Sequence, residues 1–267
     1  MKFKNAFLFD YLQRAPLPLA LERTLECELL SQQKFEKPVL DIGCGEGLFA
    51  AVLFDEKIDV GIDPDSKELE MAKNFDMYGE LICCKGNKIP KPDNTFNTIF
   101  SNSVLEHIPE IDSVIREAHR LISRDGNFYV TLPTNFFEHY SLTNVFLVKL
   151  GMKRTASKFR IFFNSFWKHY HCYDEKGWKE IFERNGFSVL NSVQYGTKFQ
   201  CLFNDFLVPF SVPSYFTKKI LNRWVLFPKI RLAFVRFLFF LSGISGKKNI
   251  KSGIKDGGLI FLHLKKS

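Results

Sequence analysis

Residues 39–47 read Val-Leu-Asp-Ile-Gly-Cys-Gly-Glu-Gly, an apolar run that passes into a loop with glycine at every second position. The apolar run is typical of a short buried strand, and residues 48–53 continue with the pattern of a helix. Glycines at a strand-to-helix turn permit positive φ and let the backbone approach a ligand closely. The free N–H groups at the start of the helix favour an anionic group. A ligand-binding loop and a simple packing turn are therefore the two interpretations of this stretch.

Two acidic residues narrow the choice of ligand. Asp41 ends the predicted strand just before the glycines, where a carboxylate repels a pyrophosphate and suits an ammonium or sulfonium group. Asp63 ends the next predicted strand, at the distance from which an acid accepts hydrogen bonds from ribose hydroxyls. Asp63 also precedes Pro64 and Asp65 in the pattern of a helix N-cap, and both roles can hold at once. The residues predict a nucleoside with a cationic amino-acid-like tail, which describes S-adenosylmethionine.

The segments around the loop alternate between strand and helix patterns. Further strands are expected at residues 57–62, 81–84, 97–101 and 127–132, and helices at 17–30, 66–74 and 111–122. Gly126 stands where we expect the C-terminal cap of the last of these helices. The alternation predicts an α/β fold with a doubly wound, mostly parallel sheet, helices on both faces and the ligand-binding loops at one edge.

The alternation weakens after residue 134. We expect a helix at residues 174–185 capped by Gly186, a strand at 187–195 and a last strand at 258–264. These additions predict seven strands in all. The predicted organisation is an N-terminal helical extension (1–35), an α/β domain (36–195 with 258–267) and a helical insertion (196–257) that Pro228 interrupts.

Several motifs follow one another in the order in which one family carries them. Residues 86–90 read Gly-Asn-Lys-Ile-Pro, 93–100 read Asp-Asn-Thr-Phe-Asn-Thr-Ile-Phe, 103–109 read Ser-Val-Leu-Glu-His-Ile-Pro, and Glu117 precedes Arg120 and Gly126. With the glycine loop, they resemble the class I S-adenosylmethionine-dependent methyltransferases, most closely the type 11 group. The resemblance covers residues 36–195 and a final strand at 258–265. It implies a Rossmann-like fold, S-adenosyl-L-methionine as cofactor and methyl transfer as the reaction.

The resemblance also implies a set of cofactor-binding residues. The glycines shape the methionine pocket, Asp41 faces its ammonium group or water around it, and Asn102 lines the methionine end. The loop at residues 86–88 contacts adenine, although a plain surface turn is the alternative there. Asn87 stands where the family usually has Asp, and its amide can still bond to adenine. The implied residues are Asp41, Gly43, Gly45, Gly47, Asp63, Gly86, Asn87, Lys88 and Asn102.

Catalytic candidates follow from the chemistry of methyl transfer. Alignment of donor and acceptor supplies most of the acceleration, and a base matters only when a hydroxyl or protonated amine must lose a proton. His107 titrates in the useful range and is one candidate catalytic residue, with a role in fixing its loop as the alternative, and Glu106 is better explained as fixing that loop. The resemblance implies His171, just before the last large helix, as a second candidate on the acceptor side. Asn135, just after the fifth predicted strand, is a candidate by position alone. We predict no metal site, because no second Cys/His pair accompanies residues 169–172.

Composition excludes some classes of protein and leaves the compartment as an expectation. The chain is 46% hydrophobic and 25% charged, which excludes a disordered chain, collagen and a polytopic membrane protein. The six cysteines form no C-x-x-C pair, so we expect reduced, mostly buried thiols in a cytoplasmic protein. No targeting segment is visible, and the late charge-free runs at residues 206–217 and 237–246 are too short to span a bilayer.

The charge distribution differs between the two halves of the chain. Residues 1–148 carry 15 basic and 23 acidic side chains, whereas residues 149–267 carry 22 and 6. The insertion also holds ten of the 30 phenylalanines. A cap over the acceptor pocket that touches an anionic membrane is our first interpretation, a cap alone is the second, and nucleic-acid binding is unlikely. The protein is then cytoplasmic or peripheral at the inner face of a membrane.

These observations predict an S-adenosylmethionine-dependent methyltransferase that acts on a small or lipid-linked acceptor, such as a quinone, isoprenoid or glycolipid intermediate. A nicotinamide-dependent oxidoreductase is the alternative enzyme, disfavoured by the spacing of the glycines and by Asp41. A non-catalytic, cofactor-binding scaffold is the alternative outside enzymes. NADH and S-adenosylhomocysteine binding would separate the two enzymes.

Overall fold

The computed structural model describes residues 1–242 and 254–267, and for residues 237–242 the backbone alone. Residues 243–253 of the predicted insertion therefore lie outside the described part, as do the side chains of its phenylalanines at 237, 239 and 240. All six cysteines are unpaired, and Cys27, Cys44 and Cys201 are buried.

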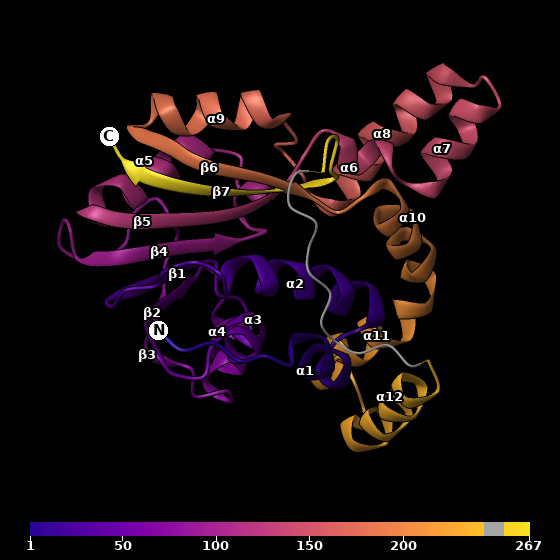
Figure 1. Cartoon of the computed structure of the whole chain (residues 1–267), viewed down its shortest axis with the longest axis horizontal. Helices are drawn as coiled ribbons and strands as arrows, with labels where there is room; N and C mark the ends of the chain where they lie inside the picture. Colours follow the sequence, from indigo (N-terminus) through magenta and orange to yellow (C-terminus); the bar gives the residue numbers. More distant parts are fainter. Residues whose placement is uncertain (243–253) are drawn as a thin grey trace.

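A seven-stranded sheet forms the centre of the protein (Figure 1). Its order is β3-β2-β1-β4-β5-β7-β6. The strands are β1 (Val39–Ile42), β2 (Ile58–Asp63), β3 (Tyr78–Cys83), β4 (Phe96–Asn102), β5 (Ile122–Pro133), β6 (Phe187–Tyr195) and β7 (Leu259–Lys266). The first five pair in parallel, and β7 runs antiparallel to both β5 and β6. The predicted Rossmann-like, doubly wound and mostly parallel sheet is confirmed.

Helices cover both faces of the sheet and bury two apolar layers against it. One layer involves α1 (Phe7–Arg14), α2 (Leu17–Leu30), α3 (Leu48–Leu53) and α4 (Ser66–Lys73). The other involves α5 (Ile111–Leu121) and α9 (Glu175–Arg184). Strand residues alternate between the layers, because successive side chains of a strand point to opposite faces. Val39 thus packs into the first layer and Leu40 into the second.

Three local predictions were wrong. The extension contains two helices, α1 and α2, where one was expected. Helix α5 ends at Leu121, and Gly126 lies inside β5 instead of capping the helix. A side chain there would come within 3.0 Å of the Asn97 carbonyl oxygen and 2.6 Å of Ile122, so glycine is required by the close packing of the strands. Pro228 begins α12 (Pro228–Ser242) instead of interrupting it, because the first turn of a helix needs no proline N–H.

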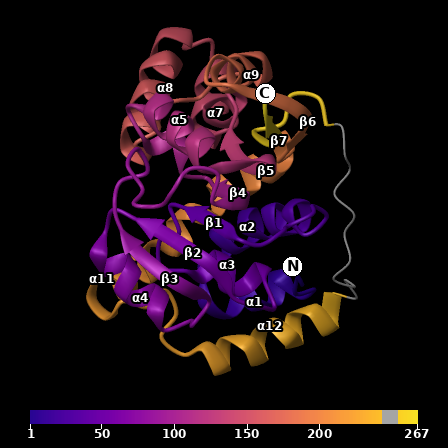
Figure 2. The same ribbon diagram turned by 90° about the vertical axis from the view of Figure 1, so that its left-hand side faces the viewer.

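The remaining helices lie beyond the carboxyl ends of the parallel strands, on the side toward which β4 points in Figure 1. They are α6 (Phe136–His139), α7 (Leu142–Lys149), α8 (Lys153–Trp167), α10 (Lys198–Leu207) and α11 (Val212–Leu221), with α12 and two short 3₁₀ turns (Leu105–His107 and Val208–Ser211). Figure 2 shows that α12 runs beneath α1, far from the sheet edge where β6 ends. In the described part of the chain, no helix combines the length and hydropathy that a membrane crossing requires.

Candidate active site

The three glycines after β1 have different structural reasons for their presence. All have positive φ, at 81°, 51° and 78° for Gly43, Gly45 and Gly47. A Cβ on Gly43 would lie 2.4 Å from Val104, and one on Gly47 would lie 3.1 Å from Ala72. No heavy atom of the described residues comes within 4 Å of a Cβ built on Gly45. Packing therefore explains Gly43 and Gly47, while Gly45 faces open space of the kind that a close-lying ligand needs.

Asp63 holds the glycine loop in place from the end of β2. Its Oδ2 accepts a hydrogen bond from the Gly45 backbone N–H at 3.0 Å, and its Oδ1 accepts one from Asp65 N–H at 2.8 Å. The N-cap of α4 is Asp65, whose own carboxylate accepts from Lys67 N–H at 2.8 Å. The N-cap alternative for Asp63 is therefore wrong. The described residues donate two hydrogen bonds to this carboxylate, which has about four lone-pair sites, so further donors such as ribose hydroxyls can bond there.

Asp41 lies beneath the loop and is 3% exposed. Its Oδ2 accepts a hydrogen bond from the Tyr78 hydroxyl at 2.7 Å. Burial raises the pKa of Asp41 to about 7, with a smaller contribution from the charge of Asp63. The two aspartates thus end neighbouring parallel strands and influence each other electrostatically.

The loop after β3 lies at the same edge of the sheet. Cys84 N–H bonds to the Asp63 carbonyl oxygen at 3.2 Å, and a Cβ built on Gly86 would lie 3.1 Å from Val114. Asn87 and Lys88 are exposed. The fold therefore brings residues 86–88 to the edge of the sheet where β2 ends at Asp63. A ligand that contacts both the glycine loop and the loop after β3 requires this arrangement.

A buried glutamate joins α2 to the ends of β4 and β6. Glu26 is 0% exposed and accepts hydrogen bonds from Asn102 Nδ2 (2.8 Å), Ser103 Oγ (2.9 Å) and Tyr195 Oη (3.2 Å). Arg23 Nη1 donates to the same carboxylate at 2.6 Å. Glu26 is not among the site residues that the sequence predicted. Its partners are distant in sequence, and no local signal identifies them.

A cavity of about 1450 Å³ adjoins this network. Most of its lining is apolar and comes from α1, α2, α8, α10 and α11. The lining also holds two groups of polar side chains. Arg23 contacts Ser103 and Glu22, and Glu106 lies close to His107 and His169. Because Ser103 follows β4, the first of these groups lies next to the carboxyl edge of the sheet.

Glu106, His107 and His169 form a compact cluster in this lining. One ligand-type atom from each lies within 4.8 Å of the others, and His107 Nε2 is 3.7 Å from Glu106 Oε1. Glu106 Oε2 and His169 Nδ1 are buried and have no hydrogen-bond partner among the described residues. Burial raises the pKa of Glu106 to about 8, lowers that of His169 to about 4 and also lowers the pKa of His107. A carboxylate and two imidazoles are also ligand types that bind divalent metals, and among the described residues this is the cluster with that composition.

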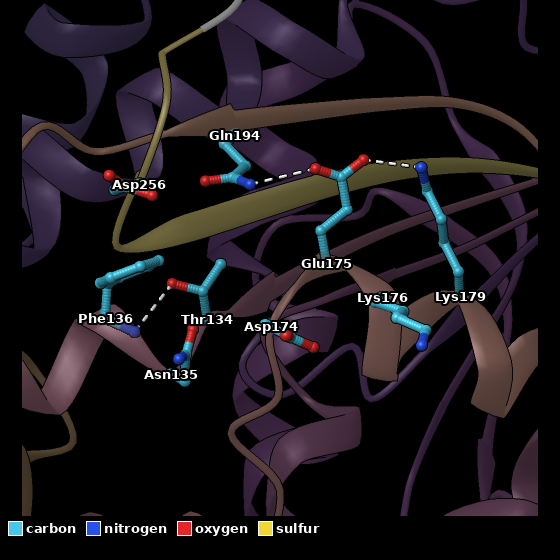
Figure 3. Close-up of a pocket in the computed structure, with 9 residues that line it drawn as sticks. All are labelled: Thr134, Asn135, Phe136, Asp174, Glu175, Lys176, Lys179, Gln194 and Asp256. Carbon is cyan, nitrogen blue, oxygen red and sulfur yellow. Dashed lines mark hydrogen bonds and ion pairs between the residues drawn. The ribbon is translucent and has the colours of Figure 1, made fainter.

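Two candidates from the sequence lie outside this cavity. His171 Nε2 lies 2.9 Å from the Ile108 carbonyl oxygen and its Nδ1 lies 3.1 Å from Tyr173 Oη, so both ring nitrogens have partners within the fold. His169, two residues earlier, lines the cavity instead. Asn135 lines a separate pocket of about 530 Å³, where Glu175 bonds to Gln194 and Lys179 (Figure 3).

Part of the insertion covers the glycine loop. The Trp224 indole N–H donates to Glu46 Oε1 at 2.6 Å, and Lys218 forms an ion pair with the same carboxylate. Lys218 also lies 3.4 Å from Glu68 at the start of α4. The segment Lys218–Trp224 therefore closes over the loop that Gly45 and Asp63 build.

The sequence profile of a family described as a methyltransferase domain matches residues 7–192. The chain belongs to the class I S-adenosylmethionine-dependent methyltransferases. Its cofactor is S-adenosyl-L-methionine. The matched range of this methyltransferase holds the glycine loop, both aspartates and the Glu106 cluster, and ends before the helical insertion. The nicotinamide-dependent alternative is accordingly set aside.

Relatives and solved structures agree with this assignment. A ubiquinone biosynthesis O-methyltransferase from Yersinia enterocolitica is 31% identical over 111 residues, which are 38% of this chain and 45% of that protein. A sterol 4-C-methyltransferase from Caenorhabditis elegans is 27% identical over 146 residues, 49% of this chain and 44% of the relative. The chain spans less than half the length of these two curated relatives.

Structural similarity extends over nearly the whole methyltransferase. A protein from Thermotoga maritima, described as a possible histamine N-methyltransferase, superposes with a TM-score of 0.59 at 16% identity. The superposition covers 94% of this chain and 92% of that one. At this identity the likeness concerns the fold alone.

Proposed function

We propose that this methyltransferase transfers the methyl group of S-adenosylmethionine to an apolar, lipid-like acceptor that binds in the cavity beside Ser103. The main evidence is the cavity itself, which has a volume of about 1450 Å³ and a mostly apolar lining. Small-molecule sites usually occupy about 300–1,000 Å³. A space of this size and polarity suits a molecule with a long hydrocarbon chain, whose reacting group would lie near Ser103, Glu106 and His107.

The cofactor half of the site is assigned to the three loops at the carboxyl edge of β1 to β4. When bound, S-adenosylmethionine supplies an electrophilic methyl group on a sulfonium sulfur. Gly45 lets the backbone approach the ligand, and Asp63 accepts from its ribose hydroxyls. Asp41 lies beneath the loop with a pKa of about 7, so a cationic group bound there favours its ionised form. Gly86, Asn87 and Lys88 contact the adenine. Asn102, fixed by its bond to Glu26, lines the methionine end.

The acceptor half is assigned to Glu106, His107 and His169. At neutral pH the raised pKa keeps the Glu106 carboxyl protonated, and the lowered pKa values keep both imidazoles neutral. A neutral imidazole can accept the proton that a hydroxyl acceptor loses during methyl transfer. The unpartnered Nδ1 of His169 and the Nε2 of His107 are the nitrogens available for that proton.

The names of two relatives support the class of acceptor. One is named for ubiquinone biosynthesis and the other for sterol methylation. Ubiquinone and sterols are apolar ring compounds, and the lining of the cavity is mostly apolar.

The experiment supplies methyl-labelled S-adenosylmethionine with an organic-solvent extract or an aqueous extract of the producing organism. We expect the labelled product in the organic phase. Label in the aqueous fraction alone would contradict a lipid-like acceptor, and the lack of any labelled product would favour the non-catalytic scaffold.

A matched pair of variants ties the activity to the cavity. Leu21→Trp fills the cavity from α2, whereas Leu17→Trp changes a residue of the same helix that is 37% exposed. We expect Leu21→Trp to lower turnover at least tenfold without changing affinity for S-adenosylhomocysteine, and Leu17→Trp to behave like the wild type. Equal turnover of the two variants would show that the acceptor binds elsewhere.

A further inference from the structure

We propose that this protein docks on the surface of an anionic lipid bilayer through the helices that surround the mouth of the acceptor cavity, and that the acceptor enters the cavity from the bilayer. The second half of this inference rests on the proposed function, whereas the docking itself does not. The face is built from two units, the α7–α8 hairpin and the α10–α11 segment.

Five aromatic side chains both line the cavity and stand exposed at its edge. They are Phe166 and Trp167 on α8, Phe199 and Phe203 on α10, and Tyr215 on α11, and their exposed fractions run from 41% to 75%. We call these five residues the aromatic rim. All five line the same cavity, so we assign them to its opening.

Most of the remaining exposed apolar surface lies on the same helices or in their connections, and the rest of the C-terminal group lies on α12 and just before it. In the described chain, all large apolar residues that are exposed fall in residues 142–167 or 199–234, apart from Leu17, Tyr170, Tyr173 and Leu190. Phe146, Phe162, Phe206 and Phe210 are among them, at 54% to 70% exposed. Soluble monomers rarely expose large contiguous apolar patches, and such patches mark interaction sites.

Charge identifies the partner as an anionic surface. Residues 142–168 contain six basic and no acidic side chains, and residues 198–236 contain seven basic and one acidic. Lys153, Lys158 and Lys219 are examples that stand exposed beside the aromatic residues. Residues 1–148, in contrast, carry an excess of eight acidic side chains. We call the two basic stretches, residues 142–168 and 198–236, the cap. An anionic membrane would attract the cap and repel the acidic part of the domain, which orients the cavity mouth toward the lipid.

Other occupants fit this face less well. A second copy of the chain would bring two strongly basic faces together. Single-stranded nucleic acid uses aromatics spaced among polar residues, whereas the stretches 159–163 and 206–210 place apolar residues in near-continuous runs. The amphipathic mix of Phe, Trp, Lys and Arg, with no described helix able to cross a bilayer, is the pattern of an interfacial surface.

The experiment is flotation of the full-length protein with vesicles of phosphatidylcholine alone or with 30% phosphatidylglycerol, at about 0.1 M and 0.5 M salt. We expect binding to the anionic vesicles at low salt, at least tenfold tighter than to the neutral ones, and weakening as salt rises. Trp167 lies in the rim, so its fluorescence should shift to the blue on binding. No binding, or equal binding to both vesicles, would overturn the proposal.

Matched variants locate the surface. Lys153→Gln with Lys158→Gln should weaken vesicle binding at least tenfold, since each basic residue near an anionic surface contributes about 1 kcal/mol. Phe199→Ser with Phe203→Ser should remove most of the remaining binding. Lys67→Gln with Lys176→Gln changes two exposed lysines outside the cap and should have no effect. If the control pair weakens binding as much as the cap variants do, the assigned surface is wrong.

Two further readouts separate the outcomes. S-adenosylhomocysteine affinity should be the same for every variant, which shows that each one is folded. If a single-stranded RNA oligonucleotide binds as tightly as the anionic vesicles do, the partner of this surface is nucleic acid and the membrane proposal is wrong. Vesicle binding requires no acceptor, so its failure leaves the proposed reaction intact, and the extract assay can fail while flotation succeeds.

Discussion

The indole N–H of Trp224 donates a 2.6 Å hydrogen bond to the carboxylate of Glu46, which lies 178 residues earlier in the glycine loop. Lys218 reinforces the contact through its ion pairs with Glu46 and Glu68. One segment of the chain therefore lies against the cofactor half of the site, while its neighbours Tyr215 and Phe203 line the acceptor cavity. The insertion is thus in a position to link the two halves.

Trp224→Phe should loosen this segment. It retains an aromatic ring but loses a hydrogen bond to a charged acceptor, which contributes about 1.5–3 kcal/mol. We expect S-adenosylhomocysteine to dissociate several-fold faster and proteases to cut faster between α11 and α12. Stopped-flow dissociation and limited proteolysis measure the two effects. Lys219→Met, at an exposed neighbouring position, is the control, and unchanged rates in Trp224→Phe would mean that the segment does not cover the ligand.

Asp63→Ala should weaken the nucleoside site. The change removes the acceptor for the Gly45 N–H and, as proposed, for ribose hydroxyls. We expect calorimetry to show S-adenosylhomocysteine affinity lowered by about 1–3 kcal/mol, on the order of 5- to 150-fold. Asp65→Ala is the matched control, because it removes the α4 cap and should lower stability alone. Equal affinities of the two variants would show that the ribose binds elsewhere.

Gly45→Ala should mainly lower cofactor affinity, whereas Gly43→Ala should mainly lower the stability of the fold. A methyl group at Gly45 meets no described atom within 4 Å, so the variant should fold with a small loss of thermal stability from its positive φ. Its affinity for S-adenosylhomocysteine should nonetheless fall at least tenfold. Gly43→Ala would force a methyl group to 2.4 Å from Val104 and should lower the melting temperature strongly. Normal cofactor affinity in Gly45→Ala would contradict the site.

Asp41 should make stability depend on pH in a defined window. Its folded pKa is raised from 3.8 to about 7, so the folded protein keeps the proton while the unfolded chain loses it between these values. Stability contributed by this group is therefore present at low pH and lost as pH rises from about 4 to 7, by up to about 4 kcal/mol.

Asp41→Asn tests that sign. The amide oxygen can still accept from Tyr78, but the side chain cannot ionise. Denaturant unfolding should show the variant gaining stability relative to the wild type as pH rises from 4 to 8. Asp55→Asn, at an exposed position, should show no such trend. A parallel pH profile for Asp41→Asn and the wild type would mean that Asp41 is ionised in the fold.

Sequence patterning determined the sheet, the glycine loop and the place of both aspartates, because these depend on local periodicity and on spacing within one strand-helix unit. Tertiary structure alone decided that Glu26 joins Tyr195 across 169 residues, that His169 and not His171 lines the cavity, and that Trp224 reaches Glu46. Helix α10 packs on α2 and helix α12 packs on α1, each far from its partner in the sequence. The burial of Glu26 and the closure of the cavity result from the packing of helices at the edge of the sheet. No local sequence pattern predicts that packing.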